Sequence, residues 1–190
     1  MIRRYLRYKE RVTRLVLAVL FGMMLAARSA DACGYFFMED HERHLLIENL
    51  INAATISTVG KDGKADKTVT TLYYDTEYES GLRVSLKNTV VFDVRGSDVL
   101  KYGKVVGTIA SNGDVSFGKH TYKIELTDER LDKRLSAHGV TTWTMTVKRG
   151  DTLVLDSAGV SALCAALGGH RDARDEVRRR IIFYLAWRET

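Results

Sequence analysis

Between residues 55 and 156, short segments rich in β-branched and aromatic residues alternate with turns that contain glycine. These turn signals recur at intervals of roughly 8 to 15 residues, which is typical of antiparallel sandwiches, rolls and small barrels. The strongest signal is Asn112-Gly113, which lies between Val105–Ile109 and Asp114–Phe117. Because both residues tolerate a positive φ, the pair predicts a β-hairpin with a type I′ turn.

Alternation of apolar and polar residues indicates the same fold class. Leu82, Val84 and Leu86 are separated by polar residues, which is the period of a strand with one solvated face. Besides the hairpin, strands are expected over Thr55–Val59, Lys67–Asp75, Leu82–Leu86, Val90–Val94, Tyr122–Leu126, Thr142–Val147 and Thr152–Asp156. The sequence therefore predicts a mainly β (α+β) domain, an antiparallel sandwich, roll or small barrel of about eight or nine short strands.

One helix is predicted before these strands, over Glu39–Ala54. Its apolar positions recur every three or four residues and form a single stripe, which consists of Ile47, Leu50, Ile51 and Ala54. Asp40 stands at the start of this segment, where its side chain could cap the helix.

One or two helices are predicted after the strands. Ser157–Leu167 is small and apolar and suits a short buried helix, whereas Arg171–Arg188 combines an apolar stripe with arginines that lie mostly off it. We expect these arginines to form a solvated face. The alternative is a basic amphipathic helix that docks on a membrane surface or receives a partner. Thr127–Ser136 is rich in charge and is expected to be an exposed helical turn or loop.

The N-terminal segment has the order of a secretory signal peptide. Six basic residues within Met1–Arg14 precede the uncharged apolar run Leu15–Ala27, and Ala30-Asp31-Ala32 then offers small residues for cleavage. The apolar run is shorter than the roughly 20 residues that span a bilayer. We expect cleavage after Ala32, so that residues 33–190 form a single globular β-rich domain; the alternatives are an uncleaved anchor or an N-terminal helix.

Removal of this leader changes the charge of the chain. Residues 1–32 hold seven of the 29 basic residues and two of the 24 acidic residues, which leaves 22 of each. A domain without net charge has no global attraction to nucleic acid. The composition therefore argues against a nucleic-acid partner.

Cys33 and Cys164 are the only cysteines, and three uses of them remain open. In an exported protein an even number of cysteines favours a disulfide, which by the chain-entropy model would contribute about 4–5 kcal/mol. A cysteine at the first mature position also resembles a bacterial lipoprotein, which would make Cys33 a lipidation site. The third possibility is two free buried thiols.

Few residues suggest a metal or catalytic site. His41 and His44 lie three residues apart in His-Glu-Arg-His, which is one residue short of the helical two-histidine zinc motif, so they are weak metal candidates. The sequence has no Gly-x-Ser-x-Gly elbow, and Cys164 has apolar neighbours that would raise its pKa. We therefore name no catalytic residue.

Arg43–Asp75 combines a predicted helix, the strand Ile-Ser-Thr-Val, an Asp-Gly turn and the strand Thr-Val-Thr-Thr-Leu-Tyr-Tyr-Asp. This order resembles the opening of flavin-binding split-barrel proteins related to pyridoxamine phosphate oxidase. The resemblance implies flavin mononucleotide (FMN) as a cofactor. In that family a strand and a basic helix that contacts the flavin phosphate follow, and here Leu82–Leu86 provides the strand.

Together, the leader and the strand pattern predict an exported bacterial protein of the periplasm, cell envelope or extracellular space. We expect a non-enzymatic binding or structural module without a cofactor, whose partner is an unknown protein or small molecule. The alternative is a flavin-binding split-barrel-like protein or enzyme that uses FMN. Membrane contact is expected only if Cys33 is lipidated or the Arg171–Arg188 helix docks on a surface.

Overall fold

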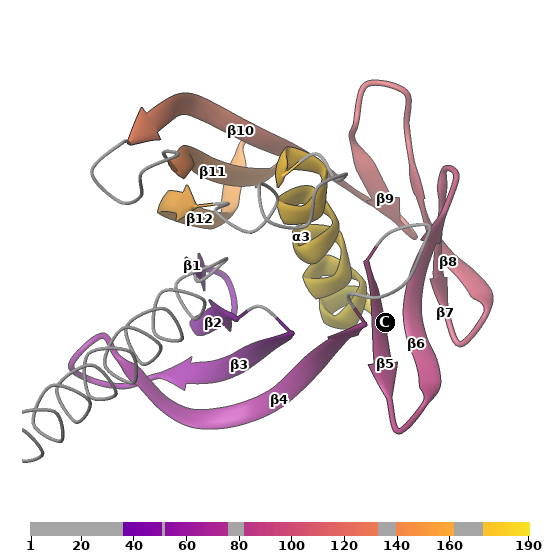
Figure 1. The fold of residues 1–190 in the computed structure, drawn as a ribbon, viewed down its shortest axis with the longest axis horizontal. Helices are drawn as coiled ribbons and strands as arrows, with labels where there is room; N and C mark the ends of the chain where they lie inside the picture. Colours follow the sequence, from indigo (N-terminus) through magenta and orange to yellow (C-terminus); the bar gives the residue numbers. More distant parts are fainter. Residues whose placement is uncertain (1–35, 51, 76–81, 133–139, 162–172) are drawn as a thin grey trace, which may run out of the picture. The chain divides into compact units, whose positions relative to one another are not determined.

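The computed structural model describes residues 36–50, 52–75, 82–132, 140–161 and 173–190. These residues form twelve strands and one helix (Figure 1). The elements are β1 (Phe36–Asp40), β2 (Leu45–Asn49), β3 (Ala53–Val59), β4 (Ala65–Asp75), β5 (Arg83–Leu86), β6 (Thr89–Arg95), β7 (Asp98–Lys101), β8 (Lys104–Ile109), β9 (Val115–Phe117), β10 (His120–Asp132), β11 (Val140–Arg149), β12 (Thr152–Ser161) and α3 (Ala173–Glu189). The prediction of a mainly β domain with a C-terminal helix is confirmed.

The strands form a closed antiparallel barrel. Each strand pairs with its neighbours in the chain, and β1 pairs with β12 through Glu39↔Asp156 and Asp40↔Leu155 to close the ring. The finer prediction, a sandwich or a small barrel of eight or nine strands, is wrong. The additional strands β1, β2 and β7 lie in segments that the sequence analysis assigned to a helix or to no element.

The predicted helix over Glu39–Ala54 is also wrong, because this segment contributes to three strands, β1, β2 and β3. Leu45, Ile47 and Asn49 of β2 are buried, whereas the residues between them are half-buried. A short apolar run fits the helical period of 3.6 residues and the strand period of 2 residues equally well. Here the pairing of β2 with β1 and β3 favours the strand. The first element of the split-barrel resemblance is therefore absent, although its Asp-Gly hairpin is present as β3 and β4.

The turn at Asn112-Gly113 closes a hairpin, but not with the predicted type I′ geometry. Gly113 has a φ of 88°, whereas Asn112 is not among the residues with positive φ. The Gly113 N–H donates to the Ala110 carbonyl (2.9 Å), which indicates a type I turn followed by a left-handed glycine. Positive φ at both central residues, as type I′ requires, occurs at Lys87-Asn88 and Tyr102-Gly103.

Two strands continue beyond their predicted ends. β10 includes Thr127–Asp132, which was expected to be a helical turn or loop, and β12 includes Ser157–Ser161, which was expected to begin a short helix. Both β10 and β12 pair with β11. Pairing with this long strand extends each of them beyond the residues in which apolar and polar side chains alternate. The remainder of the predicted short helix lies outside the described residues.

Helix α3 lies inside the ring of strands (Figure 1). All six consecutive residues Ile181–Ala186 are buried, so no face of this segment meets solvent. Its side chains contact strands on different sides of the ring, through the pairs Tyr184–Asp40 (β1), Phe183–Tyr74 (β4) and Arg174–Leu126 (β10). The helix is therefore part of the hydrophobic core.

The apolar stripe predicted for this helix is buried, with Val177, Ile181 and Leu185 at most 3% exposed. The expectation of a solvated arginine face is wrong for Arg180, which is 3% exposed. Arg188, which was not assigned to that face, is also buried, at 5% exposed. Among the described residues no helix has the length and apolar character needed to cross a membrane.

Candidate ligand-binding site

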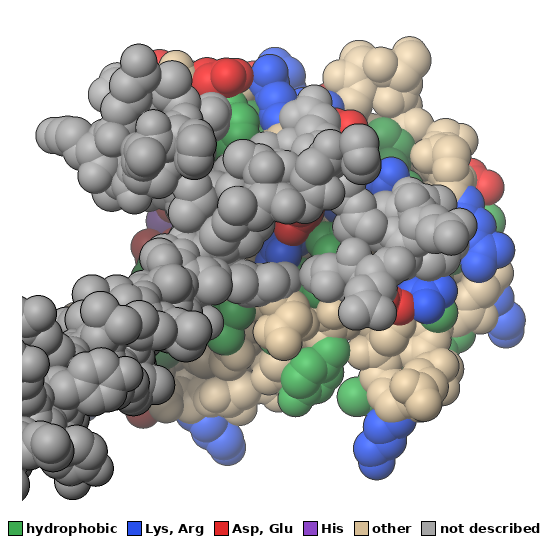
Figure 2. All heavy atoms as spheres, viewed as in Figure 1, with side chains coloured by type: hydrophobic (Ala, Val, Ile, Leu, Met, Phe, Trp, Pro, Cys, Tyr) green, Lys and Arg blue, Asp and Glu red, His purple; other side chains and the backbone are tan. Residues whose placement is uncertain are grey.

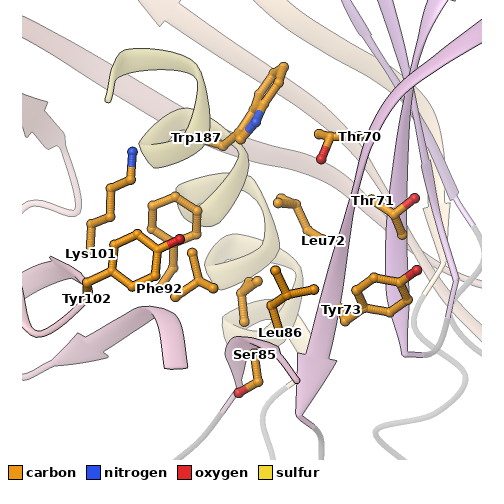
Figure 3. A pocket seen from close by; sticks show the side chains of 12 residues that line it. Thr70, Thr71, Leu72, Tyr73, Ser85, Leu86, Phe92, Lys101, Tyr102 and Trp187 are labelled. Atoms are coloured by element: carbon orange, nitrogen blue, oxygen red, sulfur yellow. The ribbon is translucent and has the colours of Figure 1, made fainter. Parts of the chain in front are cut away.

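A pocket of about 230 Å³ opens between β4 on one side and β5, β6 and β7 on the other (Figure 3). Trp187 of α3 also lines it. The remaining lining residues are Thr70–Tyr73 of β4, Val84–Leu86 of β5, Val91 and Phe92 of β6, and Lys101 with the adjoining Tyr102 at the end of β7. The pocket therefore draws on four strands and the central helix.

The pocket exists because β4 and β5 diverge. β4 has 11 residues and β5 has four, yet the two strands pair only at Tyr74↔Val84 and Asp75↔Arg83. At that end Arg83 Nη2 lies 2.6 Å from Asp75 Oδ2, so an ion pair joins the strands where their pairing stops. Beyond these two residue pairs β4 and β5 are not paired, and the pocket lies between them.

The base of the pocket is apolar. Leu72, Val84 and Phe92 are at most 5% exposed, and they form the buried part of the lining. Figure 3 shows Leu72 on the side of β4 that faces the helix, whereas Tyr73 lies on the opposite side. An apolar or aromatic group can bind to this surface without removing water from a charged side chain.

The rim of the pocket is aromatic and basic. Tyr73 and Tyr102 are 53% and 60% exposed, so their rings lie at the solvent edge of the cavity. Lys101 Nζ lies 5.8 Å from the centroid of the Phe92 ring, and no ion pair of Lys101 occurs within the described ranges. Figure 2 shows further lysine and arginine side chains on the surface of β6, β7 and β8.

The position of Trp187 depends on a buried ion cluster at the C-terminal end of α3. Arg188 Nε lies 3.1 Å from Asp40 Oδ2, and its Nη2 donates to Glu42 Oε2. The Tyr184 hydroxyl donates to the same oxygen, Asp40 Oδ2, at 2.5 Å. The Tyr184 and Trp187 rings lie 5.8 Å apart, so the same residues that anchor the helix orient the tryptophan.

The pKa values in this cluster reflect charges and hydroxyls that are paired with one another. Burial lowers the pKa of Arg188, but the hydrogen bond to Glu42 and the charge of Asp40 outweigh it, so the pKa lies above its ordinary value. Burial, followed by the hydrogen bond to Glu189, raises the pKa of Tyr122 to about 12. Arg188 is therefore charged and Tyr122 neutral at physiological pH.

Glu189 extends the cluster to β10. It accepts from the Tyr122 hydroxyl at 2.7 Å and lies 2.8 Å from His120 Nδ1. Burial raises its pKa, but these two hydrogen bonds and the charge of Arg188 outweigh burial and hold the pKa of Glu189 below its usual range. The last helical turn is therefore fixed to β1 and to β10 at once.

Of the two metal candidates, His41 belongs to a group of possible ligands among the described residues and His44 does not. His44 is exposed and has a φ of 52° in the turn after β1. His41 lies between two carboxylates, with Nε2 at 2.9 Å from Asp156 and Nδ1 at 3.6 Å from Glu39. These three residues are the one group in the described part of the chain whose donor atoms could share a metal ion, and both carboxylates are about half exposed.

Sequence reasoning missed the pocket and its tryptophan. Trp187 fell in a helix that was expected to have a solvated face, and Lys101 and Tyr102 fell between predicted strands. Asp156 is brought to His41 by the β1–β12 pairing, for which the sequence carries no local signal. Cys33 and Cys164, the candidates for a disulfide or for lipidation of Cys33, lie outside the described residues.

Comparison with known proteins gives no match. No protein-family model matches the sequence, and no curated protein or solved structure matches at a significant level. Function is therefore inferred from the pocket itself.

We expect Arg188→Met to lower the free energy of unfolding by about 3–5 kcal/mol, because it leaves the buried Asp40 carboxylate without its cation and leaves Glu42 with Arg149 alone. The matched control is Lys123→Met, which removes an exposed partner of Glu125 and should leave the free energy of unfolding nearly unchanged, because water screens this ion pair. Urea unfolding of both variants measures the difference. Equal effects would contradict the role of Arg188 as the anchor of α3.

The stability of the protein should fall at alkaline pH because of Tyr74. Burial raises the pKa of Tyr74 to about 12, against the partly opposing charge of Arg180. Below about pH 10 both states keep the proton, whereas at higher pH the unfolded state loses it first, so about 2–3 kcal/mol is lost as the pH rises to about 12. In Tyr74→Phe this part of the loss should vanish. Urea unfolding from about pH 9 to about pH 12 tests this, and equal pH slopes for the two proteins would contradict it.

Proposed function

We propose that this chain is an exported bacterial binding module, of the periplasm, cell envelope or extracellular space, and that its ligand occupies the pocket between β4 and β5–β7. The observation that carries the proposal is the apolar cavity with Trp187 on one side and Lys101 at its edge. The leader-like sequence of residues 1–32 supports export.

The lining indicates the chemistry of the ligand. The apolar base and the aromatic side chains favour an apolar or aromatic body, and Lys101 favours a negatively charged end. A volume of about 230 Å³ lies below the range of about 300–1,000 Å³ typical of sites for drug-sized ligands. The pocket therefore suits a single aromatic ring with a short anionic substituent.

The lining also suits binding better than acid–base chemistry. Its polar side-chain groups are hydroxyls, the Lys101 amine and the Trp187 indole N–H, and none of the described lining residues is a histidine, cysteine, aspartate or glutamate. Hydroxyls and an amine can orient a ligand by hydrogen bonds. We therefore retain the binding module as the proposed class.

Three probes that share a phenyl ring test the proposal: phenylpropionate, phenylpropanol and phenylpropylamine. Each should change the tryptophan fluorescence if it enters the pocket beside Trp187, and the anion should bind roughly 10-fold more tightly than the alcohol. The amine should bind most weakly, because its charge repels Lys101.

Lys101→Met should remove the preference for the anion. Lys104→Met is the matched control, because Lys104 pairs with Lys101 across the β7–β8 turn but does not line the pocket. The preference should survive in that variant. Failure of all three probes to bind, measured by fluorescence and by calorimetry, would contradict the proposed function.

A further inference from the structure

The edge of β4 that faces the pocket has a free stretch of backbone. β4 pairs with β3 from Ala65 to Tyr73, but with β5 only at Tyr74 and Asp75. Within the described ranges, residues Ala65–Tyr73 therefore have a partner strand on one side only. An edge of this kind is a template for another extended chain.

The hydrogen bonds show which backbone groups face the open side. The Tyr74 N–H donates to the Asn52 carbonyl at 2.7 Å, toward β3. In an antiparallel pair the bonded positions alternate, so Leu72 also points its backbone groups toward β3. The N–H and C=O groups of Thr71 and Tyr73 then point away from β3, toward the pocket.

A second bond agrees with this assignment. The Leu50 N–H donates to the Ala53 carbonyl at 2.7 Å, so Ala53 directs its carbonyl away from β4. Ala53 is the residue opposite Tyr73, and the two therefore form a non-hydrogen-bonded pair. Thr71 and Tyr73 thus offer two donors and two acceptors, spaced as a strand requires, at the wall of the pocket.

We propose that the pocket receives the carboxyl end of an extended polypeptide, which adds to the free edge of β4 as a further strand. Its last side chain, apolar or aromatic, enters the cavity, and its terminal carboxylate lies at Lys101. This inference rests on the proposed function, because it names the ligand class of the same pocket.

Three properties of the site support this occupant over a free small molecule. The backbone groups of a free strand edge can form hydrogen bonds with a peptide of any sequence. A pocket beside that edge then selects the peptide by one of its side chains. The volume of about 230 Å³ suits one large side chain rather than a longer ligand. The cation Lys101 is complementary to the one negative charge that every polypeptide carries at its carboxyl end.

The test uses the full chain and the synthetic peptide acetyl-Ser-Thr-Val-Thr-Val-Phe with a free carboxyl end, titrated by calorimetry. We expect it to bind at least ~10-fold more tightly than phenylpropionate, because backbone hydrogen bonds add to the contacts of the ring. The same peptide with an amide end should bind ~10-fold more weakly. In Lys101→Met the acid and the amide should bind equally, whereas Lys104→Met should preserve the difference.

Two singly N-methylated peptides, modified at the third or at the fourth residue, test the strand pairing. Only alternate N–H groups of an added strand face β4, so one of the two peptides should lose ~10-fold in affinity and the other should retain it. Equal affinities of the two methylated peptides, or a β4–β4 dimer of the chain in place of peptide binding, would overturn the inference. If phenylpropionate binds and the peptide binds no better, the inference fails and the proposed function stands; if neither binds, both fail.

Discussion

A closed ring of twelve strands must be filled, and this requirement governs the rest of the structure. A barrel of about eight strands can be filled by its own side chains, whereas a wider one encloses additional volume. Here α3 supplies the filling, with Ile181–Ala186 buried on every face. The strands and the helix therefore form one core, and neither buries its apolar surface without the other.

The helix brings charge into that core, and the charge is paired. Arg180 and Arg188 are almost fully buried, and an unpaired buried cation would be strongly destabilising. Arg180 donates to the Leu50 carbonyl at 2.5 Å and to Glu176, while Arg188 contacts Asp40 and Glu42. These bonds hold the helix to the loop after β2 and to the end of β1. They fix the axial position of α3 and, through it, the place of Trp187 beside the divergence of β4 and β5.

The sequence predicted the local structure of the barrel better than its closure. The hairpin β8–β9 and most central strands follow from glycine turns and alternation, because both signals act over a few neighbouring residues. Glu39–Ala54 was assigned to a helix because a short run of apolar positions fits both a period of 3.6 and a period of 2, and only its pairing partners distinguish helix from strand. The pairing of β1 with β12 joins residues more than a hundred positions apart, and no local pattern encodes it.

The candidate site was harder to predict for the same reason. Its cavity exists where pairing between two strands stops, which depends on the path of β4 around the helix rather than on any motif. Lys101 and Trp187 line the same pocket only because α3 lies inside the ring of strands. The sequence analysis did not single out Trp187, and nothing in the sequence marked it as part of a pocket.

Residue-resolved hydrogen exchange under native conditions tests the central claim, that α3 is the core of the barrel. If the helix and the ring fold as one unit, the amides of Ile181–Ala186 should exchange only with global unfolding, with the same protection as the best-protected amides of β11. Exchange of these helical amides by a local opening, while β11 stays protected, would show that the ring is stable without the helix and would contradict the account.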